Sequence, residues 1–276
     1  MSVVSRLVRT REGAMGLALL AIPLVAALIA PLLYPGDPLS IAGPALTPPL
    51  TDPALPLGAD RLGRDVLAGL LHGARATLLV GLAAALVAVA FGTMVGAAAG
   101  FAGGLADEML MRLTEAFQTV PGFLLALAFV SVAGASLPVV VLAIALGAWT
   151  GPARLTRAEV LSIRSRDHVA AARVAGMHPV EIALREVLPN ALPPVLALSS
   201  VIVANAVLVE AALSFLGLGD PNIVTWGSMI AEGRNVLRSA PYLSMLPGLA
   251  IVITVLGVHL VSEGLAEALA VRRVRL

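Results

Sequence analysis

The sequence lacks cysteine and lysine, because all eighteen of its basic residues are arginine. Without cysteine the chain forms no disulfide bond, zinc–thiolate site or thiol nucleophile. Without lysine it has no P-loop, whose lysine contacts the phosphates of a bound nucleotide. If ATP drives this protein, a different chain must therefore bind the nucleotide.

Charged and aromatic residues are also scarce, at 13% and 4% of the 276 residues, whereas 59% are apolar. A soluble domain contains about a quarter charged residues. With a mean hydropathy of +0.96, the chain has too little polar surface to face water on all sides. We expect an all-α, polytopic protein in contact with a lipid bilayer.

The apolar stretches predict six transmembrane helices, since a bilayer core requires about 20 apolar residues per helix. One stretch is too long for a single helix, and residues 134–138, Gly-Ala-Ser-Leu-Pro, predict a tight turn that divides it in two. The five stretches free of Asp, Glu and Arg are residues 13–36, 76–106, 116–153, 187–209 and 239–262.

Three arginines before the first span, Arg6, Arg9 and Arg11, resemble the start of a secretory signal peptide. The apolar stretch that follows is long, and Pro31 comes after the best small-residue cleavage site. We therefore expect the first helix to be retained.

The distribution of arginine predicts the orientation of the chain. With six spans, thirteen arginines lie on the side of both termini and five on the other, and six of the thirteen fall between Arg154 and Arg185. By the positive-inside rule, both termini and this loop between spans four and five are cytoplasmic. The location predicted is the bacterial inner membrane.

Two features inside the spans indicate packing or function. Gly92, Gly96 and Gly100 repeat every four residues, a spacing that lets helix backbones approach closely. Glu210 lies near the outer end of the fifth span, where an ionisable group indicates a function such as gating. Its carboxylate could instead reach the membrane interface or bond a neighbouring helix.

Catalysis by this chain has no support in its motifs. Gly217-Leu218-Gly219-Asp220 matches the GxGD of intramembrane aspartyl proteases, but those enzymes need a second aspartate at membrane depth. Asp220 precedes a proline and suits a turn that ends a helix. The four histidines are scattered and form no ligand pair. We expect no catalytic residue, cofactor site or metal site.

The two largest loops have different predicted structures. Residues 58–65, Gly-Ala-Asp-Arg-Leu-Gly-Arg-Asp, predict a folded outer cap in which Asp60 and Asp65 pair with nearby arginines. In the loop 154–186, an alanine-rich helix ends at Gly176. A second helix begins at Pro179 and ends near Leu188, because Pro189 follows. The prediction is a rigid helix–glycine–helix elbow that enters a partner's cleft.

Five separated motifs resemble those of the inner-membrane permease subunit of ABC importers, in the dipeptide/oligopeptide/nickel class and specifically its C-type subunit. The resemblance runs from about residue 10 to 265. The motifs are G-A-D-R-L-G-R-D at 58–65, A-A-A-x3-G at 170–176 followed by Leu188-Pro189, E-A-A-L-S-F-L-G-L-G at 210–219, W-G-S-M at 226–229 and P-G-L-A-I-V-I-T-V-L at 247–256.

The resemblance implies a type I ABC importer permease fold within a heteromeric complex. The implied partners are a second, homologous permease chain, two cytoplasmic ATP-binding subunits that hydrolyse ATP, and an extracytoplasmic solute-binding protein, with no nucleic acid. The implied parts of the chain are residues 1–73 (tail, first helix and outer loop), 74–265 (five-helix core, including the cytoplasmic coupling loop 154–189) and 266–276 (cytoplasmic tail).

Site residues follow from the same resemblance. The ATPase-coupling loop would use Ala171, Ala172, Arg173, Gly176, Leu188 and Pro189, and the outer-face or gating residues would be Glu210, Trp226 and Arg234. Ala170 stands where the family has a glutamate, so its contact with the ATPase is absent or replaced by Arg173 or Glu181. The stretch at 259–267 also departs from the family, which leaves the tail's usual ionic contacts open.

The substrate remains open between peptides, which we favour, and nickel, metal chelates or glutathione. A stand-alone secondary transporter is the alternative from another class. Such proteins place ionisable groups or broken helices near the midplane, often in paired repeats. The span interiors here are nearly free of charge and show no clear internal repeat, which favours the importer subunit.

Overall fold

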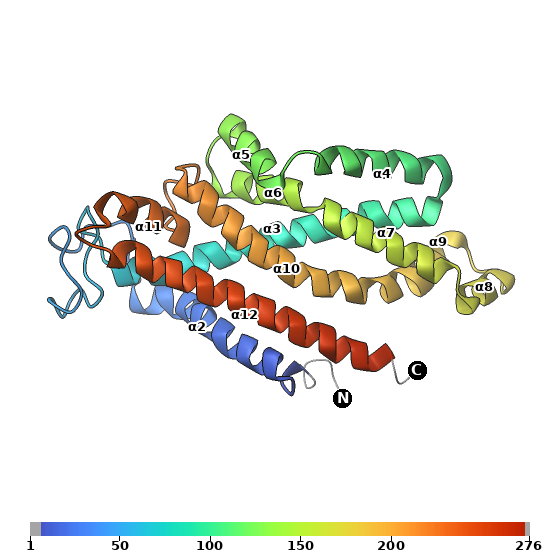
Figure 1. Cartoon of the computed structure of the whole chain (residues 1–276), viewed down its shortest axis with the longest axis horizontal. Coiled ribbons are helices and arrows are strands. Elements are labelled where there is room, and N and C mark those ends of the chain that lie inside the picture. The colour runs from blue at the N-terminus through green and yellow to red at the C-terminus, as the bar shows by residue number, and fades with distance from the viewer. Residues whose placement is uncertain (1–6, 274–276) are drawn as a thin grey trace.

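The computed structural model describes residues 7–273, which form an elongated bundle of helices (Figure 1). Arg6 and Arg275, which entered the arginine count, and the end of the tail lie outside this range. The α-helices are α2 (Arg11–Leu33), α3 (Val66–Ala102), α4 (Gly104–Gln118), α5 (Gly122–Ala133), α6 (Leu137–Ala148), α7 (Thr150–Arg164), α8 (Asp167–Val174), α9 (Pro179–Ile182), α10 (Leu188–Phe215), α11 (Trp226–Gly233) and α12 (Tyr242–Arg273).

Among the described residues, up to six helical segments are long and apolar enough to cross a membrane, if each of two bent helix pairs counts as one. Four helical stretches are long and apolar enough to span alone: α2, α3, α12 and the continuous stretch 179–215 that includes α10. The pairs α4–α5 and α6–α7 are bent by 81° and 45°. This count agrees with the six spans expected from the sequence.

The second span begins ten residues earlier than predicted, at Val66, because the Asp65 side chain accepts a hydrogen bond from Leu67 N and caps α3. The helix has 37 residues, or about 55 Å at 1.5 Å per residue. It therefore extends well beyond a hydrocarbon core of about 30 Å. The division expected between residues 73 and 74 falls inside this helix.

The predicted turn at 134–138 is present, with Gly134 at φ +91°. The helices on either side, α5 and α6, have only 12 residues each, about 18 Å, so neither crosses the core alone. The prediction was wrong for residues 154–164, which are not loop but the helix α7. One face of α7 is buried at helical spacing, through Ala153, Thr156, Val160 and Ile163.

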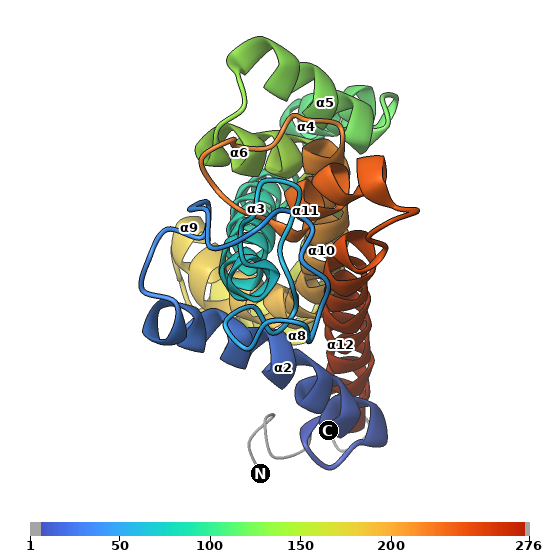
Figure 2. The same ribbon diagram turned by 90° about the vertical axis from the view of Figure 1, so that its left-hand side faces the viewer.

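The glycine repeat on α3 packs against α7. A Cβ at Gly92 would collide with the Trp149 carbonyl oxygen, and one at Gly96 with the Ala153 carbonyl oxygen. Only glycine permits this approach, so the packing role predicted for the repeat is confirmed. On the opposite edge of the bundle α2 packs along α12, with α10 between α12 and α3 (Figure 2).

Two structures that are not transmembrane occupy opposite ends of the bundle (Figure 1). At one end residues 34–65, which we call the cap, form a chain of turns beside α11. At the other end residues 166–182, which we call the elbow, contain α8 and α9. The described ends of α2 and α12, Arg11 and Arg273, point toward the elbow.

Candidate functional site

The elbow turns at Gly176, as the sequence predicted. Gly176 has φ +81°, a left-handed conformation that disfavours any residue with a Cβ. Gly176 N donates to Arg173 O and Met177 N donates to Ala172 O, at 3.0 and 3.1 Å. These two bonds satisfy carbonyls at the end of α8 in the Schellman pattern.

The second helix of the elbow does not end at Pro189, and the prediction was wrong on this point. From Pro179 the chain stays helical through α9, a π-helical segment (Ala183–Val187) and α10. Pro189 occupies the first turn of α10, where a missing N–H is tolerated. The wider π turn absorbs the change in hydrogen bonding. The elbow is therefore joined to α10 without a flexible link.

A small apolar core fixes the elbow to the bundle. It is formed by residues from α7, α8, α9, the π-helical segment and α10, namely Val160, Ile163, Val169, Ala172, Ile182, Val187 and Ala191. Each of these side chains is at most 9% exposed. A displacement of the elbow must therefore move α7 and α10 with it, since packed cores do not deform continuously.

The exposed face of the elbow carries apolar side chains beside charged ones. Val174 is 90% exposed and Val180 is more than half exposed. Leu184, in the π-helical segment that follows the elbow, is also more than half exposed. These apolar side chains are accessible for contact with a partner. Ala171 and Arg173 belong to this face, whereas Ala172 is buried and serves the core.

The position expected to carry a glutamate is the exposed Ala170. Of the two replacements considered, Glu181 is bound by Arg185 in an exposed ion pair on successive helical turns, at 2.5 Å. Arg173 is exposed in the last turn of α8. The structure therefore leaves Arg173 as the better placed of the two for a contact with a partner.

Glu210 is buried inside the bundle and does not reach the membrane interface. Only 1% of the surface of Glu210 is exposed. Oε1 accepts a hydrogen bond from the Ser214 hydroxyl at 2.7 Å, and Oε2 makes no hydrogen bond to the described residues. Beside it lies a cavity of about 10 Å³ whose lining includes Ser214, Thr225 and Asp220. The polar group is thus half satisfied, which a purely structural position does not require.

Trp226 is buried as well, so it offers no outer surface to a partner, contrary to one half of its prediction. The ring nitrogen donates to Leu70 O at 3.0 Å, and the backbone N–H donates to the Thr77 hydroxyl at 3.2 Å. Trp226 therefore locks α11 onto α3. Its gating role remains a prediction.

Arg234 is exposed next to α11, at the start of the short 3₁₀ helix Arg234–Val236. Its guanidinium lies 4.9 Å from the centre of the Phe215 ring, a cation–π contact at the end of α10. An exposed arginine at this end is compatible with the predicted outer-face role.

The Asp220 carboxylate has a structural role that sequence patterns alone do not specify. Oδ2 accepts from Leu137 N at 3.1 Å, which caps the start of α6, and Oδ1 accepts from Asn222 N at 3.0 Å. The GxGD segment is therefore a turn between α10 and α11, as the proline after Asp220 indicated. This turn also binds the start of α6 in the α5–α6 hairpin.

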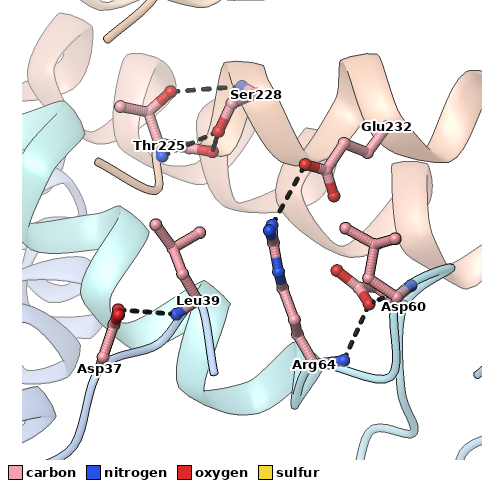
Figure 3. A network of polar contacts seen from close by, with 8 residues as sticks. Asp37, Leu39, Asp60, Arg64, Thr225, Ser228 and Glu232 are labelled. Carbon is pink, nitrogen blue, oxygen red and sulfur yellow. Dashed lines mark hydrogen bonds and ion pairs between the residues drawn. The ribbon is translucent and has the colours of Figure 1, made fainter. Parts of the chain in front are cut away.

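The cap differs in detail from the prediction. Asp60 Oδ1 accepts backbone bonds from Leu62 and Arg64, both at 2.8 Å, and Asp65 caps α3. Within residues 7–273, neither aspartate forms an ion pair with an arginine. Arg64 instead reaches across to Glu232 on α11, at 3.4 Å (Figure 3). Short turns made of Asp and Gly favour bonds to their own backbone.

Three of the sequence motifs meet around one cavity of about 310 Å³ between the cap, α11 and the α10–α11 turn. The cap contributes Asp60 and Arg64, the turn contributes Gly217, Gly219 and Asp220, and α11 contributes Ser228 and Glu232. These segments are far apart in the sequence, so their convergence appears only in three dimensions. Glu232, outside all five motifs, was missed because nothing in the sequence places it opposite Arg64.

The chain is thus a helical bundle with an anchored elbow at one end and, at the other, a cavity lined by both charged and apolar residues. The family model described as "Binding-protein-dependent transport system inner membrane component" matches residues 88–275 of the chain. The chain belongs to this family. It is therefore a membrane permease subunit that works with other subunits, and not a stand-alone secondary transporter.

Named relatives extend the match to the first helix and the cap. The di/tripeptide transport system permease protein DppC of Pseudomonas aeruginosa is 38% identical over 265 residues, which cover 94% of this chain and 88% of the relative. The probable peptide ABC transporter permease protein y4tQ of Sinorhizobium fredii is 38% identical, covering 87% and 82%. The glutathione transport system permease protein GsiD of Pectobacterium atrosepticum is 36% identical, covering 77% and 71%.

A solved structure supports the fold of this permease. A chain of the inward-facing MetNI methionine ABC transporter superposes with a TM-score of 0.53, covering 71% of the present chain and 96% of that chain. The sequence identity is 19%, so this likeness concerns the fold alone. The expected all-α, type I ABC importer permease fold is confirmed.

Proposed function

We propose that this chain forms half of the translocation pathway of an ATP-driven importer of short peptides. The observation that supports it most directly is the anchored elbow, whose exposed apolar face is built for a partner, in a chain without a P-loop lysine. ATP hydrolysis then belongs to two partner subunits that receive the elbow. A second, homologous permease chain completes the pathway, and an extracytoplasmic binding protein delivers the substrate.

The proposed orientation places the elbow in the cytoplasm and the cap outside, with both termini cytoplasmic, in the bacterial inner membrane. The elbow end carries the arginines of α7 and α8, and the described ends of α2 and α12 point the same way. An excess of arginine on one side favours the cytoplasm.

Force transmission follows from the packing. When the ATPases close on ATP, they shift the elbow, and the shared core moves α7 and α10 together. The helix α10 also carries Glu210, and it packs against α11. A movement that starts at the elbow is thereby passed to the cavity at the other end of the bundle. The inward- and outward-facing states alternate as a result.

Peptides are the favoured substrate because two of the relatives named above are described as peptide permeases. Glutathione, itself a modified tripeptide, is the alternative that a third relative's name supports, and nickel or a metal chelate is the remaining one. The chain would be reconstituted in vesicles with its permease partner, ATPases and binding protein. ATP-dependent uptake of labelled dialanine, exceeding that of glutathione and of nickel, is the expected result. Uptake of nickel or glutathione alone would overturn the peptide assignment.

A further inference from the structure

The cavity between the cap and α11 holds charges of both signs that are only loosely paired. Arg64 and Glu232 face each other across it (Figure 3), and their contact is a single one of 3.4 Å. A strong arginine–carboxylate pair is bidentate and about 2.7–2.9 Å long. Arg157 and Asp107, on α7 and α4 of this chain, form such a bidentate pair, with bonds of 2.5 and 2.7 Å. The Arg64–Glu232 pair is therefore poised to exchange partners.

The backbone is held in place at both residues, whereas their charged groups make few contacts. Arg64 N donates to Asp60 Oδ1 and Arg64 O accepts from Asp60 N, at 2.8 and 2.9 Å, which fixes the backbone of the cap. Glu232 stands on α11, whose start is fixed by reciprocal bonds between Thr225 and Ser228. Among the described residues, the guanidinium of Arg64 makes no other hydrogen bond, although it offers five N–H donors.

Nearby charges also favour a ligand with two charged ends. Burial raises the pKa of the Glu232 carboxyl most, Arg64 lowers it, and Asp60 raises it further by repulsion. A positive group placed between Glu232 and Asp60 would relieve this repulsion. The negative group that must accompany it would then take the donors released on Arg64, with Arg61 at the same cavity. The volume of about 310 Å³ lies at the lower end of ligand pockets, about 300–1,000 Å³.

We propose that this cavity binds a short zwitterionic peptide, with the free carboxylate on Arg64 and the free ammonium group on Glu232. The ligand replaces one weak internal ion pair with two pairs of opposite charge, so neither Arg64 nor Glu232 is left unpaired. The site would receive substrate at the cap end before it enters the bundle. This inference rests on the proposed peptide importer and adds a recognition site within the permease itself.

The test is equilibrium dialysis of the purified permease–ATPase complex in nanodiscs, without the binding protein. Three ligands are compared: dialanine, its N-acetyl derivative and its C-terminal amide. The native complex should bind dialanine about tenfold more tightly than either blocked form, because each block removes one charge-assisted contact. Arg64→Gln should lose only the preference over the amide, and Glu232→Gln only the preference over the acetyl form. Arg238→Gln, an exposed arginine that does not line the cavity, should keep both preferences.

Other results separate this site from the proposed function. No binding of dialanine by the native complex, equal binding of all three ligands, or an equal loss for all three in both variants would overturn the site. Uptake of dialanine by the complete transporter is measured in parallel. If uptake proceeds while the preferences are absent, the importer stands and the cavity proposal fails. If uptake of every peptide is absent, the proposed function itself fails.

Discussion

At the scale of single residues, Glu210 combines burial with an incomplete set of hydrogen bonds. Its Oε1 is bonded by Ser214, and its Oε2 is buried without a partner among the described residues. A buried polar group left unsatisfied costs about 1–3 kcal/mol. An apolar side chain of similar size in its place is expected to be neutral or stabilising.

Replacing Glu210 with methionine should therefore separate stability from transport. We expect Glu210→Met to keep or raise the free energy of unfolding, by about 1 kcal/mol, while ATP-dependent uptake falls. Thermal unfolding and vesicle uptake measure the two effects. Leu208→Met, on an exposed position of the same helix, should leave both unchanged. Native uptake in Glu210→Met would exclude a gating role for this carboxylate.

Glu232 predicts a pH dependence of stability. Burial, followed by the charge of Asp60, raises the pKa of this carboxyl, against the opposing effect of Arg64. A raised pKa in the folded state means that the contribution to stability is present at low pH and lost as pH rises through the folded pKa. The melting temperature of Glu232→Gln minus that of the native protein should therefore increase with pH. A difference that stays constant or decreases would contradict the assigned environment.

At the scale of helices and turns, the elbow depends on the left-handed conformation of Gly176. A Cβ there would meet no atom within 4 Å, so substitution strains the backbone without causing a clash. Gly176→Ile should add about 1–2 kcal/mol of local strain and uncouple ATP hydrolysis from uptake, with membrane insertion intact. Asparagine tolerates this conformation better, so Gly176→Asn should retain more coupling. Equal, native uptake in both variants would remove the turn from the mechanism.

Sequence patterns predicted the elements better than their boundaries. The six spans, the turn at Gly134 and the end of α8 at Gly176 follow from local rules, because apolar length and glycine are read residue by residue. Pro189 was misread as a stop, since a proline in a first turn and a proline after a helix look alike without the surrounding helix. Because α7 contains several arginines, its buried apolar face was likewise not recognised in the sequence.

The site was predictable only in part, for a related reason. The motifs at 58–65, 217–220 and 226–229 were visible, but their meeting at one cavity depends on the packing of α3, α10 and α11. Long-range pairs such as Arg64 with Glu232 and Asp107 with Arg157 leave no local signal. Burial of Trp226 could not be inferred from its place near a span end, since such residues often lie at the interface.

At the scale of the whole molecule, the elbow and the cap lie at opposite ends of the bundle. The elbow is two short helices anchored on a buried apolar core, and the cap is a chain of turns beside a cavity that contains Arg64 and Glu232. Elements between them, α7 and α10, share a core with the elbow, and α10 continues to the cavity end. The proposed coupling of an event at one end with a change at the other requires such a connection.

The proposed orientation can be measured directly, because the chain contains no cysteine. Single cysteines at Leu50 in the cap and Val174 in the elbow occupy residues 89% and 90% exposed. In cells with a permeable outer membrane and an intact inner membrane, a membrane-impermeant thiol reagent should label Leu50→Cys and spare Val174→Cys. Permeabilised membranes should allow both reactions. Labelling of Val174→Cys alone in intact cells would reverse the orientation.

The central claim is that the elbow is the contact between this permease and its ATPases. The most direct measurement is cross-linking in the assembled complex, from Val174→Cys or Val180→Cys on the elbow to single cysteines in the ATPase, with Leu50→Cys as the control. The account predicts a disulfide between the elbow and the ATPase that changes in yield when ATP is bound, and none from the cap. Cross-linking to the ATPase from Leu50 with none from Val174 or Val180 would contradict it.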